Sequence, residues 1–502
     1  MKSAPGYFLG ADKSLKIYNV MEINNLNNPL ADQFVFWDAK GNIRPHLLYD
    51  YFNLIGIGNY FSDEKNMKTA DPNLVKTNGN VVSKINVGHL LEITKEHILR
   101  RTEETGDSGP ILDSLHSKTA LFSDKNLRLL KTLPLNFISD TPEYGYFFFL
   151  NGVVQISATE TVLKPYSDFD DHVWESSIIQ RDYVPVETKD LQELSDHMRF
   201  LSDLTVVEDP AKTVERFTSL ASAIGYMLHR FKDPTTTKAI ILMDVYVDGQ
   251  PNGGSGKTLL IQSIGKVRNL SIVDGKKYDQ HEWFALSSVD LGSELLLFDD
   301  TEKNFNFEEI FPLVTTGFLV RLKYKNNVYL PFEKSPKVAI TTNYAILGDS
   351  SSHKRRKFEF EISPTYSAKY SPREKYGRTF FEGWDDQQWN FFHNTMFQCV
   401  QVFLKEGLIE SEPINLNLTK LINKTCEEFV EWIDERLDPG KPYDKKALYN
   451  SFLKAYPELS GKLKQRDFTF YLRSWGEYSK QVVTETHSGD TRYIQFSTET
   501  NV

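Results

Sequence analysis

The sequence predicts an α/β fold that contains a parallel sheet. Three short apolar runs, Lys238–Val247, Glu294–Phe298 and Lys337–Thr341, have the continuous character of strands buried on both faces. The first run leads directly into a group of glycines, and a stretch with helical character, Leu259–Val267, follows them. A strand, a glycine-rich loop and a helix in this order are typical of a phosphate-binding site.

Length and composition indicate several folded domains in one chain. The 502 residues are enough for about two to four separate cores. The net charge of −10 argues against nonspecific binding of nucleic acid over the whole surface, although it leaves room for a local basic channel. The two cysteines, Cys399 and Cys426, have no pairing spacing and no neighbouring histidines, which favours a reducing, cytoplasmic setting. No run approaches the ~18 apolar residues that span a bilayer, so we expect no membrane partner.

Residues 1–188 predict a small α+β domain. The apolar spacing of His46–Ile57 is helical, and the segment ends at glycines that can stop a helix. Tyr144–Ile156 predicts a hairpin in which Asn151-Gly152 is the turn signal. No strong catalytic constellation occurs in this part of the chain, so we expect it to pack against the rest, recruit a partner or support self-association.

The glycine-rich loop departs from the eight-residue phosphate-loop pattern at one position. Its window is Pro251-Asn252-Gly253-Gly254-Ser255-Gly256-Lys257-Thr258, with Pro251 where the first glycine is expected. Glycines let successive backbone N–H groups converge on phosphate oxygens, so we expect residues 252–258 to bind the phosphates. Lys257 adds a charge on the β- and γ-phosphates, and the Thr258 hydroxyl is a ligand for Mg²⁺. The alternative is a glycine-rich turn with an incidental Lys-Thr pair, which the strand before and the helix after disfavour.

Two acidic residues follow the second apolar run. In Leu295–Asp300 a buried strand delivers Asp299 and Asp300 at its carboxyl end, where such folds place a carboxylate against the metal. We assign Asp299 to the Mg²⁺ shell and Asp300 to polarising the attacking water, with Glu302 as the substitute for that second role. An ordinary strand end is the alternative, and the order and distance after Lys257 argue against it.

A polar amide and a basic cluster complete the set. Asn343 ends the third apolar run, where its amide can hydrogen-bond the γ-phosphate or the attacking water, although asparagine is also a frequent turn residue. The segment Ser352–Lys357 is densely basic and includes Arg355 and Arg356. An arginine from this cluster can stabilise charge on the transferring phosphoryl group across a subunit boundary. The alternative is a solvated charge run.

These four elements together resemble superfamily 3 helicases. The stretch from Phe298 to Ile362 is most similar to the helicase part of phage and mobile-element primase-helicase replication proteins, through Phe298-Asp299-Asp300, Thr342-Asn343-Tyr344 and Lys354-Arg355-Arg356-Lys357. The resemblance implies a ring-forming AAA+ ATPase over 189–365 with leading helices, usually hexameric, which uses ATP and Mg²⁺ and moves along single-stranded DNA. It also implies that ATP lies between subunits, with Arg355 or Arg356 acting in trans.

The resemblance further implies that Gly317–Pro331 enters the pore of the ring. A hairpin with Lys323 and Lys325 near its tip would grip the phosphate backbone of DNA, because backbone contacts carry affinity without reading sequence. An ordinary surface hairpin with solvated lysines is the alternative. A primase site needs metal-binding acids on a sheet, and the nearest candidate, Asp168–Asp171, lies in a polar stretch. We therefore expect a separate primase or other replication protein as a partner.

The C-terminal part predicts a helical connector, 366–425, and a winged-helix-like domain, 426–502. Three helical segments are followed by a hairpin: Cys426–Leu437, Asp444–Tyr456, Leu463–Trp475 and Gln481–Phe496. Four basic residues lie on or just before the third helix, which is the helix that enters the major groove in such domains: Lys462, Lys464, Arg466 and Arg473. Winged helices also bind proteins, so contact with DNA or with protein stays open.

The leading hypothesis is an ATP-dependent DNA helicase that acts on single-stranded or forked DNA in replication of a phage, plasmid or mobile element. It would work in the cytoplasm of a bacterium or of a phage-infected host. One alternative is an ATP-binding replication initiator or scaffold without processive unwinding. Another is an NTPase that remodels protein or packages nucleic acid.

Overall fold

The computed structural model describes most of the chain. The described ranges are 29–61, 72–103, 106–247, 250–251, 253–289, 292–303, 305–320, 328–346, 348, 350–433, 436–438 and 440–498. No helix in these ranges has both the length and the apolar composition that crossing a bilayer requires.

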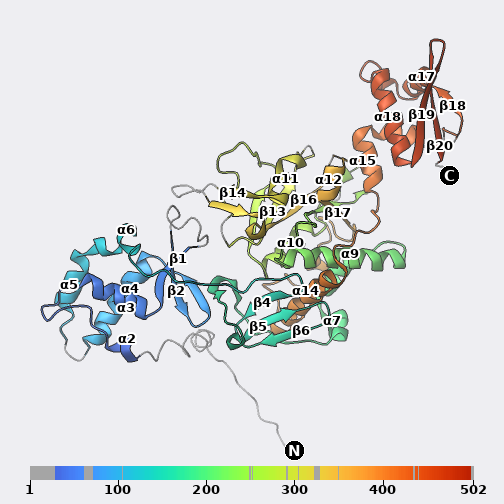
Figure 1. Ribbon diagram of the computed structural model, residues 1–502. Coiled ribbons are helices and arrows are strands. Elements are labelled where there is room, and N and C mark those ends of the chain that lie inside the picture. The colour runs from blue at the N-terminus through green and yellow to red at the C-terminus, as the bar shows by residue number, and fades with distance from the viewer. Residues whose placement is uncertain are drawn as a thin grey trace, which may run out of the picture. The chain divides into compact units, whose positions relative to one another are not determined.

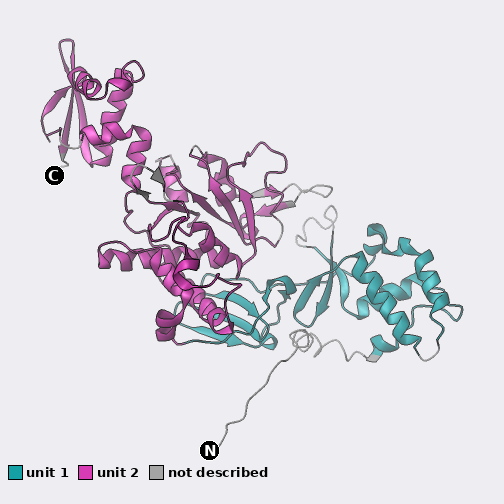
Figure 2. Ribbon diagram, turned by 180° about the vertical axis from the view of Figure 1, so that it is seen from behind, with its two compact units in different colours: residues 1–186, 229–231, 321–328 teal, residues 187–228, 232–320, 329–502 magenta. Residues whose placement is uncertain are grey.

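The chain folds as two compact units, which Figure 2 shows in different colours. The first comprises Met1–Val186 with His229–Phe231 and Arg321–Val328. The second comprises Glu187–Leu228, Lys232–Val320 and Tyr329–Val502. The four elements of the candidate site, from the glycine-rich loop to the basic cluster, therefore belong to a single unit.

The first unit combines helices with two small sheets (Figure 1). Its helices are α2 (Pro29–Gln33), α3 (Pro45–Leu54), α4 (Val87–Arg101), α5 (Gly109–Ser117) and α6 (Asp124–Leu127). One sheet has the order β1-β2-β3-β7, formed by Ile57–Tyr60, Asn73–Asn78, Val81–Lys84 and Val173–Trp174. The other has the order β6-β5-β4-β8, formed by Thr161–Lys164, Gly152–Ile156, Gly145–Phe149 and Ile178–Ile179.

The hairpin expected over Tyr144–Ile156 is present as β4 and β5, but its turn lies one residue earlier. Phe149 pairs with Gly152, so Leu150 and Asn151 form the turn and Gly152 begins the strand. A Cβ atom at Gly152 would meet the backbone carbonyl oxygen of Lys164 on β6. Glycine is thus required here by the close approach of the neighbouring strand, in addition to its φ of 149°.

The second unit begins with helices that flank the site. The helical stretch expected over Lys189–Leu204 is two helices, α7 (Thr188–Leu194) and α8 (Asp196–Asp203), and α9 (Pro210–Leu228) follows. The division falls at Ser195, whose Oγ accepts a hydrogen bond of 3.1 Å from the backbone N–H of Met198. A serine that caps a new helix in this way ends the preceding one, which the apolar spacing alone did not reveal.

A five-stranded parallel sheet forms the centre of this unit, as the three apolar runs predicted. Its order is β12-β13-β16-β9-β17, formed by Leu270–Asp274, Leu295–Thr301, Lys337–Thr342, Ala239–Asp244 and Lys357–Ile362. Every residue of β9 and β16 is buried, because these strands are covered on both faces. The long helix α14 (Asp386–Glu406) packs closely on α9, since a Cβ at Gly225 would meet the backbone of Cys399.

The strand that precedes the glycines is shorter than the run Lys238–Val247 suggested. β9 ends at Asp244, and a two-stranded hairpin of β10 (Tyr246–Val247) and β11 (Gln250–Pro251) stands between it and the glycines. The helix α10 (Lys257–Gly265) then begins inside the motif itself. Six residues, 245–250, therefore separate the end of the strand from the eight-residue window.

The C-terminal elements agree with the predicted helices and hairpin. They are α15 (Leu416–Lys424), α16 (Glu427–Ile433), β18 (Pro442–Asp444), α17 (Lys445–Ala455), α18 (Gln465–Tyr478), β19 (Gln481–Ser488) and β20 (Thr491–Thr498). The strands form an antiparallel sheet of order β18-β20-β19, and an aromatic core that includes Phe429, Trp432 and Phe468 holds the helices together.

Candidate nucleotide site

The predicted residues Lys257, Thr258, Asp299, Asp300 and Asn343 meet at the carboxyl edge of the central sheet. Lys257 begins the helix that follows β9, Asp299 and Asp300 end β13, and Asn343 follows β16 directly. Because β9, β13 and β16 are parallel, their carboxyl ends lie along one edge. Side chains from three distant parts of the sequence are thereby brought within hydrogen-bonding distance of one another.

The glycine-rich loop has a backbone that only glycine adopts readily. Gly254 has a φ of 84° and Gly256 a φ of 101°, both in the left-handed region. A Cβ at Gly254 would lie 3.0 Å from the backbone nitrogen of Ala368, so the loop is also closely covered on one side. Gly256 is the N-cap of α10, whose first N–H groups have no partner within the helix and suit an anion. Asn252, also predicted to bind phosphate, lies outside the described residues.

Lys257 is held by three oxygen atoms. Its ammonium lies 2.5 Å from Asp244 Oδ1, 3.0 Å from Asn343 Oδ1 and 3.4 Å from Ser255 Oγ. Ser255 in turn donates a hydrogen bond to the same Asp244 oxygen. Asp244 was not among the predicted site residues, although it ends β9, the strand before the glycines.

Asp299 lies beside Thr258, as expected of two groups that share a metal ion. The Thr258 hydroxyl donates to Asp299 Oδ1 at 3.3 Å, and the Thr341 hydroxyl donates to the same oxygen at 2.5 Å. Mg²⁺ is typically held by one or two protein oxygens with the rest supplied by phosphates and water, and this donor set fits that pattern. Thr341 was not predicted as a site residue; it orients the carboxylate.

Asp300 has an unusual backbone that turns its side chain toward the same edge. The register between β13 and β16 shifts between Phe298 and Thr301, and Asp300 has a φ of 54°. Its N–H donates to Thr341 Oγ1 at 2.9 Å. Successive side chains of a regular strand point to opposite faces, so this bulge is what lets Asp299 and Asp300 both face the site.

The carboxylate of Asp300 is shared between two partners. Asn343 donates to its Oδ1 at 3.4 Å, and Lys276, in the turn after β12, forms an ion pair with its Oδ2. The hydrogen bond with Asp300 raises the pKa of Lys276. Lys276 is a further site residue that the sequence did not reveal. Glu302, the predicted substitute for Asp300, is exposed beyond the end of β13.

The basic cluster divides into exposed and structural members. It forms α12 (Ser351–Arg356) and the start of β17. Arg355 is exposed, whereas the guanidinium of Arg356 lies 4.5 Å from the ring centroid of Phe311 and burial lowers its pKa. Lys357 is buried and donates to the carbonyl oxygen of Ile346 at 2.7 Å. Of the two arginines, Arg355 is therefore the more exposed.

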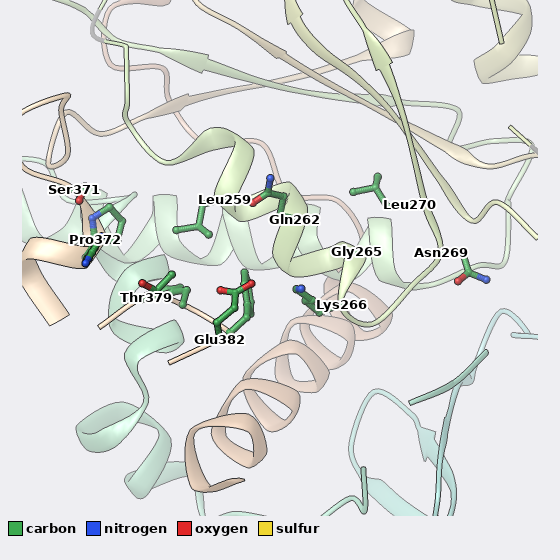
Figure 3. Close-up of a pocket in the computed structure, with 13 residues that line it drawn as sticks. Leu259, Gln262, Gly265, Lys266, Asn269, Leu270, Ser371, Pro372, Thr379 and Glu382 are labelled. Atoms are coloured by element: carbon green, nitrogen blue, oxygen red, sulfur yellow. The ribbon is translucent and has the colours of Figure 1, made fainter. Parts of the chain in front are cut away.

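A pocket of about 800 Å³ is lined on one side by residues of α10 (Figure 3). Leu259 and Gln262 line it from α10, and Ser371, Thr379 and Glu382 line it from the segment that follows β17. The lining combines the apolar side chain of Leu259 with polar side chains such as Gln262 and Glu382.

Two further predictions concern the hairpin Gly317–Pro331 and the acidic segment Asp168–Asp171. The hairpin expected over Gly317–Pro331 contains β14 (Gly317–Val320) and β15 (Val328–Pro331), which pair with each other. Lys323 and Lys325 at its predicted tip lie outside the described residues. Asp168, Asp170 and Asp171 of the acidic segment are exposed, and in the described part of the chain no group of three His, Cys, Asp or Glu side chains is arranged to hold a metal ion.

The chain matches no protein-family model, and it has no match among curated proteins. It is similar to the apo structure of the C-terminal region of NrS-1, with 13% identity, a TM-score of 0.40, and coverage of 90% of this chain and 98% of that chain. It is also similar to JCV helicase bound to an acetamide ligand, with 11% identity, a TM-score of 0.21, and coverage of 56% and 70% of the two chains. Similarities at this level define neither the family nor the activity of this chain.

Proposed function

We propose that this chain binds and hydrolyses ATP with Mg²⁺ at the loop 253–258. The observation that carries the proposal is the continuous polar network from Lys257 through Asn343 to Asp300, next to the pair Thr258 and Asp299. A phosphate cradle, a metal-binding pair and a water-orienting pair are the parts that phosphoryl transfer requires, because catalysis there depends on positioning and charge.

Each side chain has a role that follows from its contacts. Thr258 and Asp299 would hold Mg²⁺, which neutralises charge on the phosphates when it is bound. Lys257 binds the β- and γ-phosphates as a point charge. Asp300 accepts a hydrogen bond from the attacking water, and Asn343 orients that water because its amide already contacts both Asp300 and Lys257.

We further infer that the chain self-associates into a ring, with a hexamer as the expected form. Arg355 would complete the site of a neighbouring subunit. It is exposed at the end of the short helix α12, and its neighbour Arg356 is already used for packing on Phe311. An exposed guanidinium is suited to stabilise charge on a phosphoryl group supplied from another subunit.

We also propose that ATP hydrolysis by this chain drives the unwinding of DNA. It is supported by the resemblance to superfamily 3 helicases in the order and spacing of the four elements. The C-terminal helices and hairpin are consistent with a winged helix, in which Arg466 has a side chain that is 93% exposed. Arg473, in contrast, is held by Glu485 of β19 at 2.6 Å, so it serves that domain's own structure.

The deciding experiment measures ATP turnover with and without single-stranded DNA, alongside strand separation of a forked duplex. We expect DNA to stimulate turnover and ATP to drive separation. Lys257→Ala is the control. It should lower turnover at least about 100-fold, because it removes the positive charge that binds the phosphates. Turnover without stimulation or strand separation would favour a protein-remodelling NTPase. DNA-dependent assembly without unwinding would favour an initiator. Appreciable turnover by Lys257→Ala would contradict the assignment of the loop.

A further inference from the structure

We infer that Asp244 is a built-in competitor of the nucleotide phosphates for Lys257, and that it lowers the affinity of the site for nucleotide. The inference rests on the proposed function, because it concerns the same loop. It assigns a role to a residue that stands outside the eight-residue phosphate-loop window, at the end of the preceding strand.

The ammonium of Lys257 has no free hydrogen-bonding capacity. It carries three N–H donors, and three oxygens surround it, from Asp244 at 2.5 Å, Asn343 at 3.0 Å and Ser255 at 3.4 Å. The Lys257 side chain is only 9% exposed. A phosphate oxygen that binds this ammonium must therefore displace at least one of the three acceptors.

Asp244 is the acceptor whose displacement costs most. Its side chain is fully buried, and Lys257 is the cation that pairs with it. Its second oxygen, Oδ2, is buried and has no hydrogen-bond partner among the described residues. When Lys257 turns toward a phosphate, the buried carboxylate of Asp244 loses part of its ion pair with the ammonium. The same carboxylate is then also repelled by the negative charge of the nucleotide. Both effects oppose binding.

The contact between Asp244 and Lys257 follows from the path of the chain after β9. Because β10 and β11 separate the strand end from the glycines, the loop returns over Asp244, and Ser255 donates a hydrogen bond to the oxygen that also contacts Lys257. Asp244 itself is fixed by its position in β9, where it pairs with Ile362 of β17. The carboxylate therefore stays in place while the lysine side chain can move.

The test compares ADP affinity, in the presence of Mg²⁺, between the unmodified protein and Asp244→Asn by isothermal titration calorimetry. Asparagine keeps the shape and removes the charge. We expect about tenfold tighter binding of ADP, because both opposing effects depend on that charge. Glu294→Gln is the matched control. It neutralises a buried acid paired with Arg268 at the start of β13, at the other end of the sheet, and should leave the affinity unchanged.

Two additional measurements test whether the variants are folded and whether the ammonium of Lys257 is released. Thermal melting establishes that each variant is folded, and Asp244→Ser provides a second uncharged side chain if Asp244→Asn is unstable. Acetylation of Lys257, followed by mass spectrometry without nucleotide, should become faster in both variants because the ammonium is released. Equal or weaker ADP binding by the folded variants would overturn the inference while leaving the proposed function intact. Failure of the unmodified protein to bind ADP would remove the proposed function and this inference with it.

Discussion

The ammonium of Lys257 lies 3.0 Å from the side-chain oxygen of Asn343, although the two residues are 86 positions apart. The amide nitrogen of Asn343 is at the same time 3.4 Å from Asp300. One side chain therefore joins the glycine-rich loop to the end of β13. A change at either end of this connection is transmitted through a single amide group, so the loop and the acidic residues are expected to act as one unit.

Asn343→Ala should lower ATP turnover about 100-fold while ATP binding changes little, because the amide orients the attacking water and Lys257 retains its other contacts. The measurement is kcat by a coupled assay, together with binding of a fluorescent ATP analogue. Asn394→Ala, a buried asparagine on α14, is the control. A loss confined to binding would contradict the assigned role.

Thr341→Val should raise the Mg²⁺ concentration needed for half-maximal turnover roughly tenfold. The Thr341 hydroxyl donates to Asp299 at 2.5 Å, and loss of a group that orients a metal ligand typically weakens the site by 10–100-fold. Magnesium titration of ATP turnover measures this shift. Thr342→Val removes a buried hydroxyl that donates to the backbone of Thr301 and should not move the midpoint. An unchanged midpoint in Thr341→Val would show that Asp299 is oriented by other groups.

Arg355→Ala and Arg356→Ala should have different effects. Arg355→Ala should abolish turnover and leave the melting temperature unchanged, because the side chain is exposed. Arg356→Ala should destabilise the protein by about 1 kcal/mol, through loss of its contact with Phe311 and its hydrogen bond to Ser352. The measurements are turnover and thermal melting.

Mixing Arg355→Ala with Lys257→Ala subunits tests the action in trans. Each variant alone should be inactive, and mixed assemblies should regain part of the turnover, because some interfaces then combine an intact loop with an intact arginine. If mixing restores nothing, Arg355 does not act across a subunit boundary.

Lys323→Ala combined with Lys325→Ala should abolish unwinding and preserve basal ATP hydrolysis, because these lysines are assigned to the DNA backbone and not to the nucleotide. Forked-duplex separation and turnover without DNA are the two measurements. Lys95→Ala with Lys405→Ala, which removes two lysines that are exposed on α4 and α14, provides a control of equal charge. Unwinding that survives the first double change would exclude the assigned pore contact.

The linear sequence was sufficient for the parallel sheet, and it singled out residues that this sheet brings together at one edge. Lys257, Asp299 and Asn343 could be found because each stands directly beside a buried apolar run or a group of glycines. Parallel strands bring their carboxyl ends to one edge, so strand ends predict a common location without knowledge of the contacts. A prediction of this kind needs only the local sequence, because residues that are adjacent in the chain remain adjacent after folding.

The partners of those residues depended on the tertiary structure. Asp244, Thr341 and Lys276 occupy the site because of strand register, the bulge at Asp300 and the turn after β12, none of which has a local signature. The proposal of Arg355 in place of Arg356 likewise rests on a tertiary contact, the packing of the Arg356 guanidinium on the Phe311 ring. Chain segments far apart in the sequence meet only when the sheet is assembled, and the contacts between them decide which groups are held in place and which remain free to react.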